Sequence, residues 1–204
     1  VLSNGNIASC SNDRMIRVWG PAGEKKICEF EDYAGVFSIA ELSHDLLASG
    51  SKNKAIAIWD LKNRKLARTL KGHTLGILAL LVLPNGNLVS GSWDDTIKVW
   101  GPYSSDFILL ATMKEHGTRF TNNFSTTHDG YILACSTNKT VSRNYYDNRS
   151  SINKIKMWNQ NGELLRTFST GATDASSILG LRDGRVAVGF LSGRFAVFDI
   201  NNIN

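Results

Sequence analysis

The chain has 204 residues, of which 42% are apolar and 20% charged, a composition typical of a soluble globular protein with enough apolar material for a sizeable core. Its net charge of +5 is scattered along the sequence, which favours a solvated surface over a nucleic-acid patch. The longest apolar run, residues 77–83, is too short to cross a bilayer. No secretory signal is visible, although Val1 is not an initiator methionine.

The three cysteines indicate the redox environment of the protein. Cys10, Cys28 and Cys135 lie far apart, and an odd number cannot all pair within the chain. We expect reduced thiols in a cytoplasmic or nuclear protein.

Short strand signals recur in chain order, and the clearest set lies in residues 73–115. A buried strand at 77–83 precedes the turn Asn85-Gly86, and a second polar turn at Asp94-Asp95 precedes a strand at 96–100. Upstream, residues 65–70 (KLARTL) supply the fourth type of strand. Matching turns occur at Asn4-Gly5, Asp129-Gly130 and Asp183-Gly184. No segment has a helical period with caps, so the sequence predicts an all-β protein.

One thirteen-residue phrase ending in tryptophan is repeated. The three copies are IASCSNDRMIRVW at 7–19, LASGSKNKAIAIW at 47–59 and LVSGSWDDTIKVW at 88–100. The terminal tryptophans Trp19, Trp59 and Trp100 are 40 and 41 residues apart. Trp158 follows after 58 residues and Phe198 after another 40, so the period is about 40 with one insertion.

Four short strands per period of about 40 residues are the pattern of a β-propeller blade. The Gly72-His73 pair, the Trp59-Asp60 pair and the SGSxxD phrase resemble the tryptophan-aspartate (WD) repeat family. The resemblance covers nearly the whole chain and is strongest in the first three periods. It implies five blades, at about residues 1–31, 32–72, 73–115, 116–170 and 171–204, with eighteen strands distributed three, four, four, four and three. We expect an open arc belonging to a larger propeller of about seven blades, completed by a longer chain or another subunit.

The resemblance also implies a buried structural tetrad, which only the third blade holds complete: His73, Ser90, Asp94 and Trp100. Asp94 is expected to accept from the imidazole, and Ser90 from the indole N–H, which can only donate. A hydrolase triad would use the same residue types, but a nucleophile must be exposed and a triad does not explain the tryptophan.

The other blades depart from the tetrad. Blade 1 has Ser9, Asp13 and Trp19 without a histidine, and blade 2 has Asn53 at the Asp position and Asp32 at the His position. Blade 4 has Cys135 for the serine, and blade 5 has Val188, Ser192 and Phe198.

The candidate functional surface is the face carrying the loops before the first strand and between the second and third strands. The family resemblance places partner contacts there at Asn12, Phe37, Lys52, Leu78, Trp93, Phe120, Asn122 and Asp174, with Ser176 as a further position. Trp93 is the strongest candidate, because it lies in a polar turn and is not repeated in the other blades. Exposed aromatic residues are enriched among binding hot spots. The alternative is that Trp93 packs on a neighbouring blade, and Phe37 and Phe120 equally fit core or channel packing.

No phosphate-binding glycine loop and no His or Cys cluster with metal spacing is present, so no metal, cofactor or small-molecule substrate is expected. Residues 138–154 form a polar insertion that is either an extended turn or a partner-specific arm.

The leading interpretation is a non-catalytic scaffold for protein or peptide partners. The alternatives are a substrate-recognition subunit in a ubiquitin pathway, a propeller-fold hydrolase and an RNA-associated assembly factor.

Overall fold

The computed structural model describes residues 1–43, 45–102, 104, 106–114, 124–136, 154–171, 175–190 and 192–200. These residues form eighteen β-strands and no α-helix. The strands make five antiparallel sheets, each built from consecutive strands, which confirms the all-β propeller-blade architecture.

Each sheet is one blade. Blade 1 consists of β1 (Ile7–Cys10), β2 (Met15–Trp19) and β3 (Lys26–Glu31). Blade 2 consists of β4 (Val36–Ser43), β5 (Leu46–Ser51), β6 (Ala55–Asp60) and β7 (Lys65–Lys71). Blade 3 consists of β8 (Ile77–Val82), β9 (Leu88–Ser92), β10 (Thr96–Trp100) and β11 (Leu109–Lys114). Blade 4 consists of β12 (Phe124–Thr126), β13 (Ile132–Ser136), β14 (Lys154–Trp158) and β15 (Leu164–Ser169). Blade 5 consists of β16 (Ala175–Gly180), β17 (Arg185–Phe190) and β18 (Phe195–Asp199).

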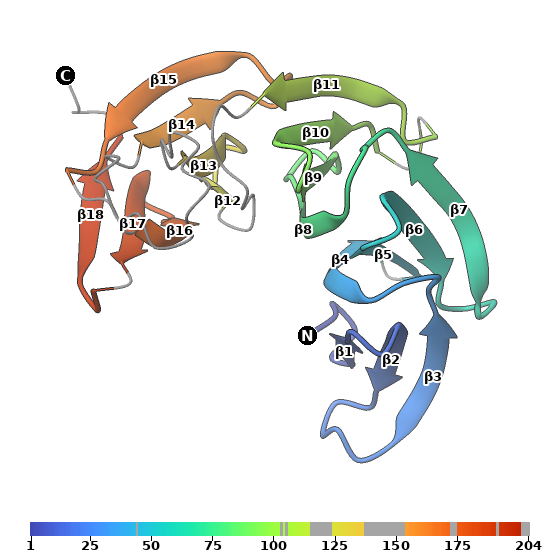
Figure 1. Ribbon diagram of the computed structural model, residues 1–204. Coiled ribbons are helices and arrows are strands. Elements are labelled where there is room, and N and C mark those ends of the chain that lie inside the picture. The colour runs from blue at the N-terminus through green and yellow to red at the C-terminus, as the bar shows by residue number, and fades with distance from the viewer. Residues whose placement is uncertain are drawn as a thin grey trace, which may run out of the picture.

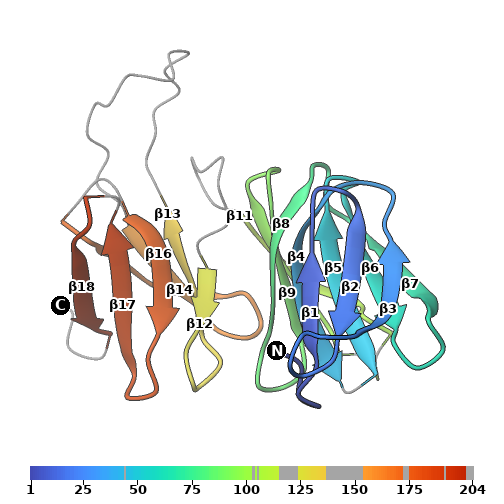
Figure 2. The same cartoon turned by 90° about the horizontal axis from the view of Figure 1, so that it is seen from below.

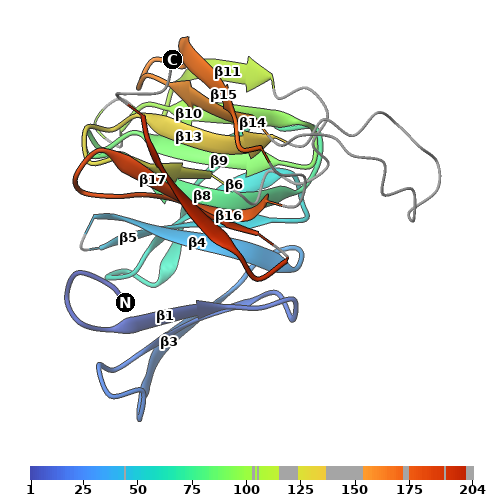
Figure 3. The same ribbon diagram turned by 90° about the vertical axis from the view of Figure 1, so that its left-hand side faces the viewer.

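The five blades are arranged as an open arc (Figure 1), as expected. Strands β4, β8, β12 and β16 line its inner side, and β3, β7, β11 and β15 lie on the outer rim. Figure 3 shows the sheets of neighbouring blades stacked face against face. The turns that join β1 to β2 and β3 to β4 lie at one edge of the arc, the upper edge in Figure 2. That edge is called the candidate face below.

The turns follow from glycine chemistry. Gly5, Gly86, Gly130 and Gly184 have φ between 81° and 86°, a region that L residues rarely adopt. In each case the glycine N–H donates to the carbonyl three residues earlier, as Gly86 does to Leu83 at 2.9 Å. This is a type I turn closed by a left-handed glycine, a common three-residue hairpin connection.

The cores lie between blades rather than within them. Four clusters of buried side chains are present, and each draws its members from two successive blades. A single sheet therefore cannot bury its faces alone, which is the physical reason for the repetition.

The repeated tryptophan is buried at the interface between two neighbouring blades. Trp59, Trp100 and Trp158 are 3–6% exposed, and each belongs to a cluster shared with the preceding blade. A β-bulge recurs immediately before the tryptophan in the pairing of the third and fourth strands of blades 1 to 4. In blade 5, Phe198 takes this place and lies 6.2 Å from the Phe168 ring of blade 4.

The outward faces of the first and last blades are uncovered in this structure. Phe195 and Val197 of β18 are 78% and 43% exposed, whereas the equivalent Ile97 and Val99 of blade 3 are fully buried against blade 4. At the other end Trp19 is half-exposed.

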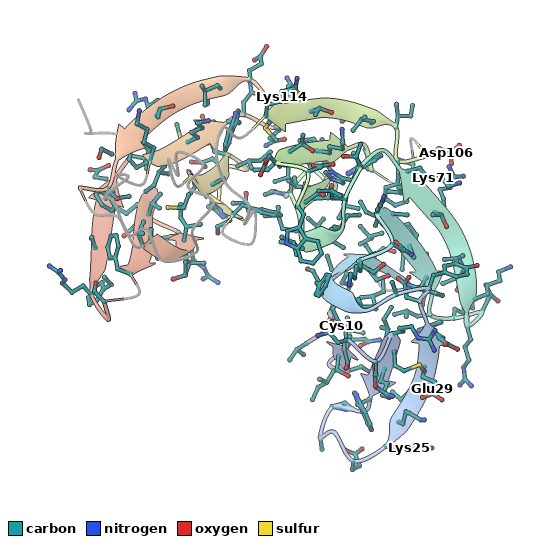
Figure 4. All side chains as sticks on the ribbon, in the orientation of Figure 1. Cys10, Lys25, Glu29, Lys71, Asp106 and Lys114 are labelled. Carbon is teal, nitrogen blue, oxygen red and sulfur yellow. The ribbon has the colours of Figure 1, made fainter. Side chains whose placement is uncertain are left out.

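The three cysteines are free, with Cys28 and Cys135 buried and Cys10 half-buried on the inner part of blade 1 (Figure 4). Burial raises the pKa of the Cys10 thiol and that of the Cys28 thiol. The described residues contain no helix long and apolar enough to span a membrane.

Candidate functional site

The blade 3 tetrad residues form one hydrogen-bonded chain. Trp100 Nε1 donates to Ser90 Oγ at 2.8 Å, and Ser90 Oγ lies 2.8 Å from His73 Nε2. His73 Nδ1 in turn lies 2.9 Å from Asp94 Oδ2. Because an indole can only donate and a carboxylate accepts, the chain fits neutral His73 with its proton on Nδ1. Every polar atom in the chain is then satisfied, as a buried network requires.

Burial and hydrogen bonding shift the two titratable members. Desolvation lowers the pKa of His73, with its Asp94 hydrogen bond acting in the opposite direction. Burial alone raises the Asp94 pKa, but hydrogen bonds from Thr96, the Thr74 N–H and His73 outweigh it, so the net pKa is lowered. A neutral imidazole beside an ionised carboxylate is the result.

The same geometry argues against a triad at this site. Ser90 is fully buried, and its hydroxyl oxygen already accepts the Trp100 N–H. An attacking hydroxyl needs access to a substrate carbonyl. Among the described residues, no group of three His, Cys, Asp or Glu side chains is placed to hold a metal ion.

Blade 2 replaces the tetrad with a network of reversed polarity. Asp32 stands at the histidine position, is 2% exposed, and accepts hydrogen bonds throughout. The donors to Asp32 are Ser49 Oγ (3.1 Å), Ser51 Oγ (3.2 Å), Asn53 Nδ2 (2.8 Å) and the Tyr33 N–H (2.7 Å). Trp59 Nε1 still donates to Ser49 Oγ, at 2.9 Å. Asp32 can only accept, and Asn53 supplies an N–H donor that an aspartate at that position would lack. The substitutions at the His and Asp positions of the tetrad therefore compensate each other.

Blade 1 departs differently. Trp19 Nε1 donates to Ser9 Oγ at 3.0 Å, but Asp13 accepts from Arg17 Nη1 at 2.9 Å instead of from a histidine. In blade 4 Cys135 is 6% exposed, and in blade 5 Val188 is fully buried. Ser192 of blade 5 lies in an exposed turn.

On the candidate face, Trp93 and Phe37 come together from two blades. Their ring centroids are 5.3 Å apart with an interplanar angle of 62°, an edge-to-face contact. Both side chains are half-buried. Trp93 therefore does pack on a neighbouring blade, as the alternative interpretation held, while part of its ring stays accessible.

Glycine makes this junction possible. A Cβ on Gly76 would lie 2.9 Å from Trp93 Cε3 and 3.2 Å from the Lys52 Cα, so Gly76 is held between its own blade and blade 2. Gly35 takes the equivalent place one blade earlier, where a Cβ would lie 3.3 Å from the Asn12 Cα. Sequence reasoning missed both glycines, although their spacing of 41 residues matches the repeat.

The remaining expected contact positions divide into three groups. Asn12 and Lys52 are exposed. Leu78 is only 7% exposed, so it offers no surface to a partner, and its assignment to the face is corrected. The physical reason is its place at the β-bulge of β8, an innermost strand that lies against β4 of blade 2. Phe37 occupies the equivalent bulge of β4 but is bulkier and extends to Trp93.

Phe120, Asn122, Asp174 and the insertion at 138–154, apart from Lys154, lie outside the described residues. The strand containing Ser176 is described, but its side chain is not. Two exposed apolar residues of the candidate face were missed, Tyr33 at 81% and Leu75 at 44%. Both stand in the loop before the first strand, at the first and second positions after the Asp32 or His73 site.

Comparison with known proteins agrees with this geometry. Residues 64–101, which span the end of blade 2 and most of blade 3, match the family described as WD domain, G-beta repeat. The chain contains a WD repeat.

Three relatives are similar to parts of this chain. Nuclear distribution protein PAC1 of Arthroderma otae is 27% identical over 179 residues, covering 82% of this chain and 36% of that protein. Probable cytosolic iron-sulfur protein assembly protein 1 of Eremothecium gossypii is 33% identical over 108 residues, covering 49% and 33%. Ribosome biogenesis protein YTM1 of Vanderwaltozyma polyspora is 24% identical over 132 residues, covering 56% and 29%. The chain thus spans about a third of the length of the relatives it matches.

Proposed function

We propose that this WD-repeat chain is a non-catalytic interaction scaffold that presents the candidate face to a protein or peptide partner. The observation that carries the proposal is the Phe37–Trp93 pair, two half-exposed aromatic rings contributed by neighbouring blades. A few residues dominate the binding energy of most interfaces, and tryptophan is among the types enriched in that set. Because the two rings pack against each other across the blades, little conformational entropy is lost when a partner binds.

The names of the relatives support this class of function. They describe nuclear distribution, iron–sulfur protein assembly and ribosome biogenesis, three processes that need several proteins to be brought together. We place the chain in the cytoplasm or nucleus on the same ground.

We further propose that additional blades, from a longer chain or another subunit, cover the outward faces of blades 1 and 5. The supporting observation is Phe195, which is 78% exposed where the equivalent Ile97 of blade 3 is fully buried. Phe195→Glu should reduce concentration-dependent self-association, measured by light scattering. If another subunit supplies the blades, the variant should also capture less of that subunit. An unchanged mass distribution together with unchanged subunit capture would refute this part.

The scaffold proposal is tested by affinity capture followed by mass spectrometry, comparing the wild-type chain with Trp93→Ala. At least one partner should be lost from Trp93→Ala and retained by a control variant, Lys25→Glu. Lys25 lies in the β2–β3 turn on the outer rim of blade 1, away from the Phe37–Trp93 junction (Figure 4). If both variants capture the same partners as the wild type, the candidate face is not the binding site.

A further inference from the structure

Three lysines gather without counter-charges at the candidate face of blade 2. Lys52 and Lys54 lie in the β5–β6 turn, and Lys71 ends β7 directly opposite Ala55, the residue after Lys54. All three side chains are exposed, and among the described residues none of them is in a hydrogen bond or ion pair through its ammonium group.

Blade 1 has an ion pair at the positions where blade 2 has two of these lysines. Arg14 and Glu31 occupy the positions equivalent to Lys54 and Lys71, and their side chains form an ion pair of 2.9 Å. In blade 2 both positions carry a positive charge instead. Lys54 directly precedes Ala55, the strand partner of Lys71, so two like charges lie close together and disfavour the folded state by a few tenths of a kcal/mol or more. A repulsion of this kind has no structural benefit, whereas a bound anionic group would relieve it.

The carboxylates nearby do not neutralise the three lysines. Glu31 is paired with Arg14, and Asp94 is buried in the tetrad. Asp32 is buried and accepts only from neutral groups. Asp95 belongs to blade 3, where it lies half-buried in the β9–β10 turn.

One of the three lysines, Lys52, adjoins the aromatic pair. The Lys52 Cα lies next to Gly76, on which the Trp93 ring rests, and Trp93 contacts Phe37. Leu75, 44% exposed, precedes Gly76 in the same loop. An apolar contact surface is therefore bordered on one side by a cluster of cations.

On the basis of the scaffold function proposed above, we propose that this surface binds an acidic peptide segment of the partner. One large apolar side chain of the peptide packs against Phe37 and Trp93, and flanking Asp or Glu residues lie over Lys52, Lys54 and Lys71. The apolar contact supplies affinity, and the charges supply orientation and speed of association.

The test begins with a phage library of random dodecapeptides selected on the wild-type chain. Enriched peptides should contain Asp and Glu around one large apolar residue. The best peptide, fluorescein-labelled, is then titrated against variants by fluorescence polarisation. Lys71→Glu should weaken binding at least tenfold, and Trp93→Ala should weaken it at least as much.

Lys71→Glu is informative because it restores the charge pattern of blade 1. Its melting temperature should equal or exceed that of the wild type, so lost binding cannot come from lost folding. Lys25→Glu changes the net charge equally and should leave peptide binding unchanged.

Several results would overturn the proposal. One is a selection with no enrichment of Asp and Glu, and another is an equal loss of binding in Lys25→Glu and Lys71→Glu. A third is a twelve-nucleotide oligouridine that binds more tightly than the peptide and depends on Lys71, which would make the surface an RNA site. If the selection fails while affinity capture still yields a partner that depends on Trp93, only the acidic-peptide proposal is wrong and the scaffold proposal stands.

Discussion

Replacing Trp100 by alanine should destabilise the protein by about 3–5 kcal/mol. Trp100 is 3% exposed, and a buried tryptophan of roughly 200 Å² at ~25 cal/mol per Å² corresponds to about 5 kcal/mol as an upper bound. Large-to-alanine substitutions in cores give values in the same range. The substitution also removes the donor to Ser90 Oγ, which lies 2.8 Å away.

The assay is equilibrium urea unfolding followed by circular dichroism. Trp100→Phe keeps a buried aromatic ring but lacks the indole N–H, so the free energy of unfolding should fall by about 1–2 kcal/mol. It also serves as the measurable variant if Trp100→Ala does not fold. Trp19→Ala is a matched control, because Trp19 has the same place in blade 1 and the same bond to a serine but is half-exposed. If Trp100→Ala destabilises no more than Trp19→Ala, burial between blades is not what the repeated tryptophan provides.

The remaining predictions concern pH and the candidate face. The lowered pKa values of His73 and Asp94 mean that the unfolded chain binds more protons than the native one in acid. The free energy of unfolding should therefore fall as pH drops below about 6.5, the ordinary histidine pKa, and fall again below about 4. His73→Gln, compared with the wild type in urea titrations at several pH values, should remove the upper part of this dependence; an identical profile would contradict the assignment. Gly76→Ala should displace Trp93 and weaken partner binding at least fivefold while the protein remains folded, and unchanged binding would show that the Trp93 position is not critical. Trp93→Ala should destabilise by about 1–2 kcal/mol through its lost contact with Phe37, well below the Trp100→Ala value in the same urea assay.

The blades could be predicted from the sequence because their determinants are local. Turns such as Asn85-Gly86 fix where a hairpin reverses, and the 40- and 41-residue tryptophan spacings fix the period. The resulting distribution of eighteen strands over five sheets agrees with the structure. The tetrad geometry was accessible for the same reason, since Ser90, Asp94 and Trp100 lie within one repeated phrase.

The face was harder to predict because its contacts cross between blades. Phe37 and Trp93 are 56 positions apart, and whether their rings meet depends on the stacking of two sheets and on side-chain rotamers. The burial of Leu78 has the same origin. The sequence shows that Asp32 and Asn53 both differ from the tetrad residues. That Asn53 donates to Asp32, the reverse of the order in blade 3, could be learned only from the hydrogen-bond geometry. The charge cluster at Lys54 and Lys71 needed strand register, which pairs Lys71 with Ala55, the residue after Lys54.

The most direct test of the account is whether binding and folding separate at the two tryptophans. The partner recovered by affinity capture is titrated calorimetrically into the wild type, Trp93→Ala and Trp100→Phe, with a urea unfolding curve recorded for each. We expect Trp93→Ala to bind about thirtyfold more weakly, equivalent to about 2 kcal/mol, while it still unfolds cooperatively. Trp100→Phe should bind normally whenever it is folded. Unchanged affinity in Trp93→Ala, or loss of its folded state at zero urea, would contradict the account.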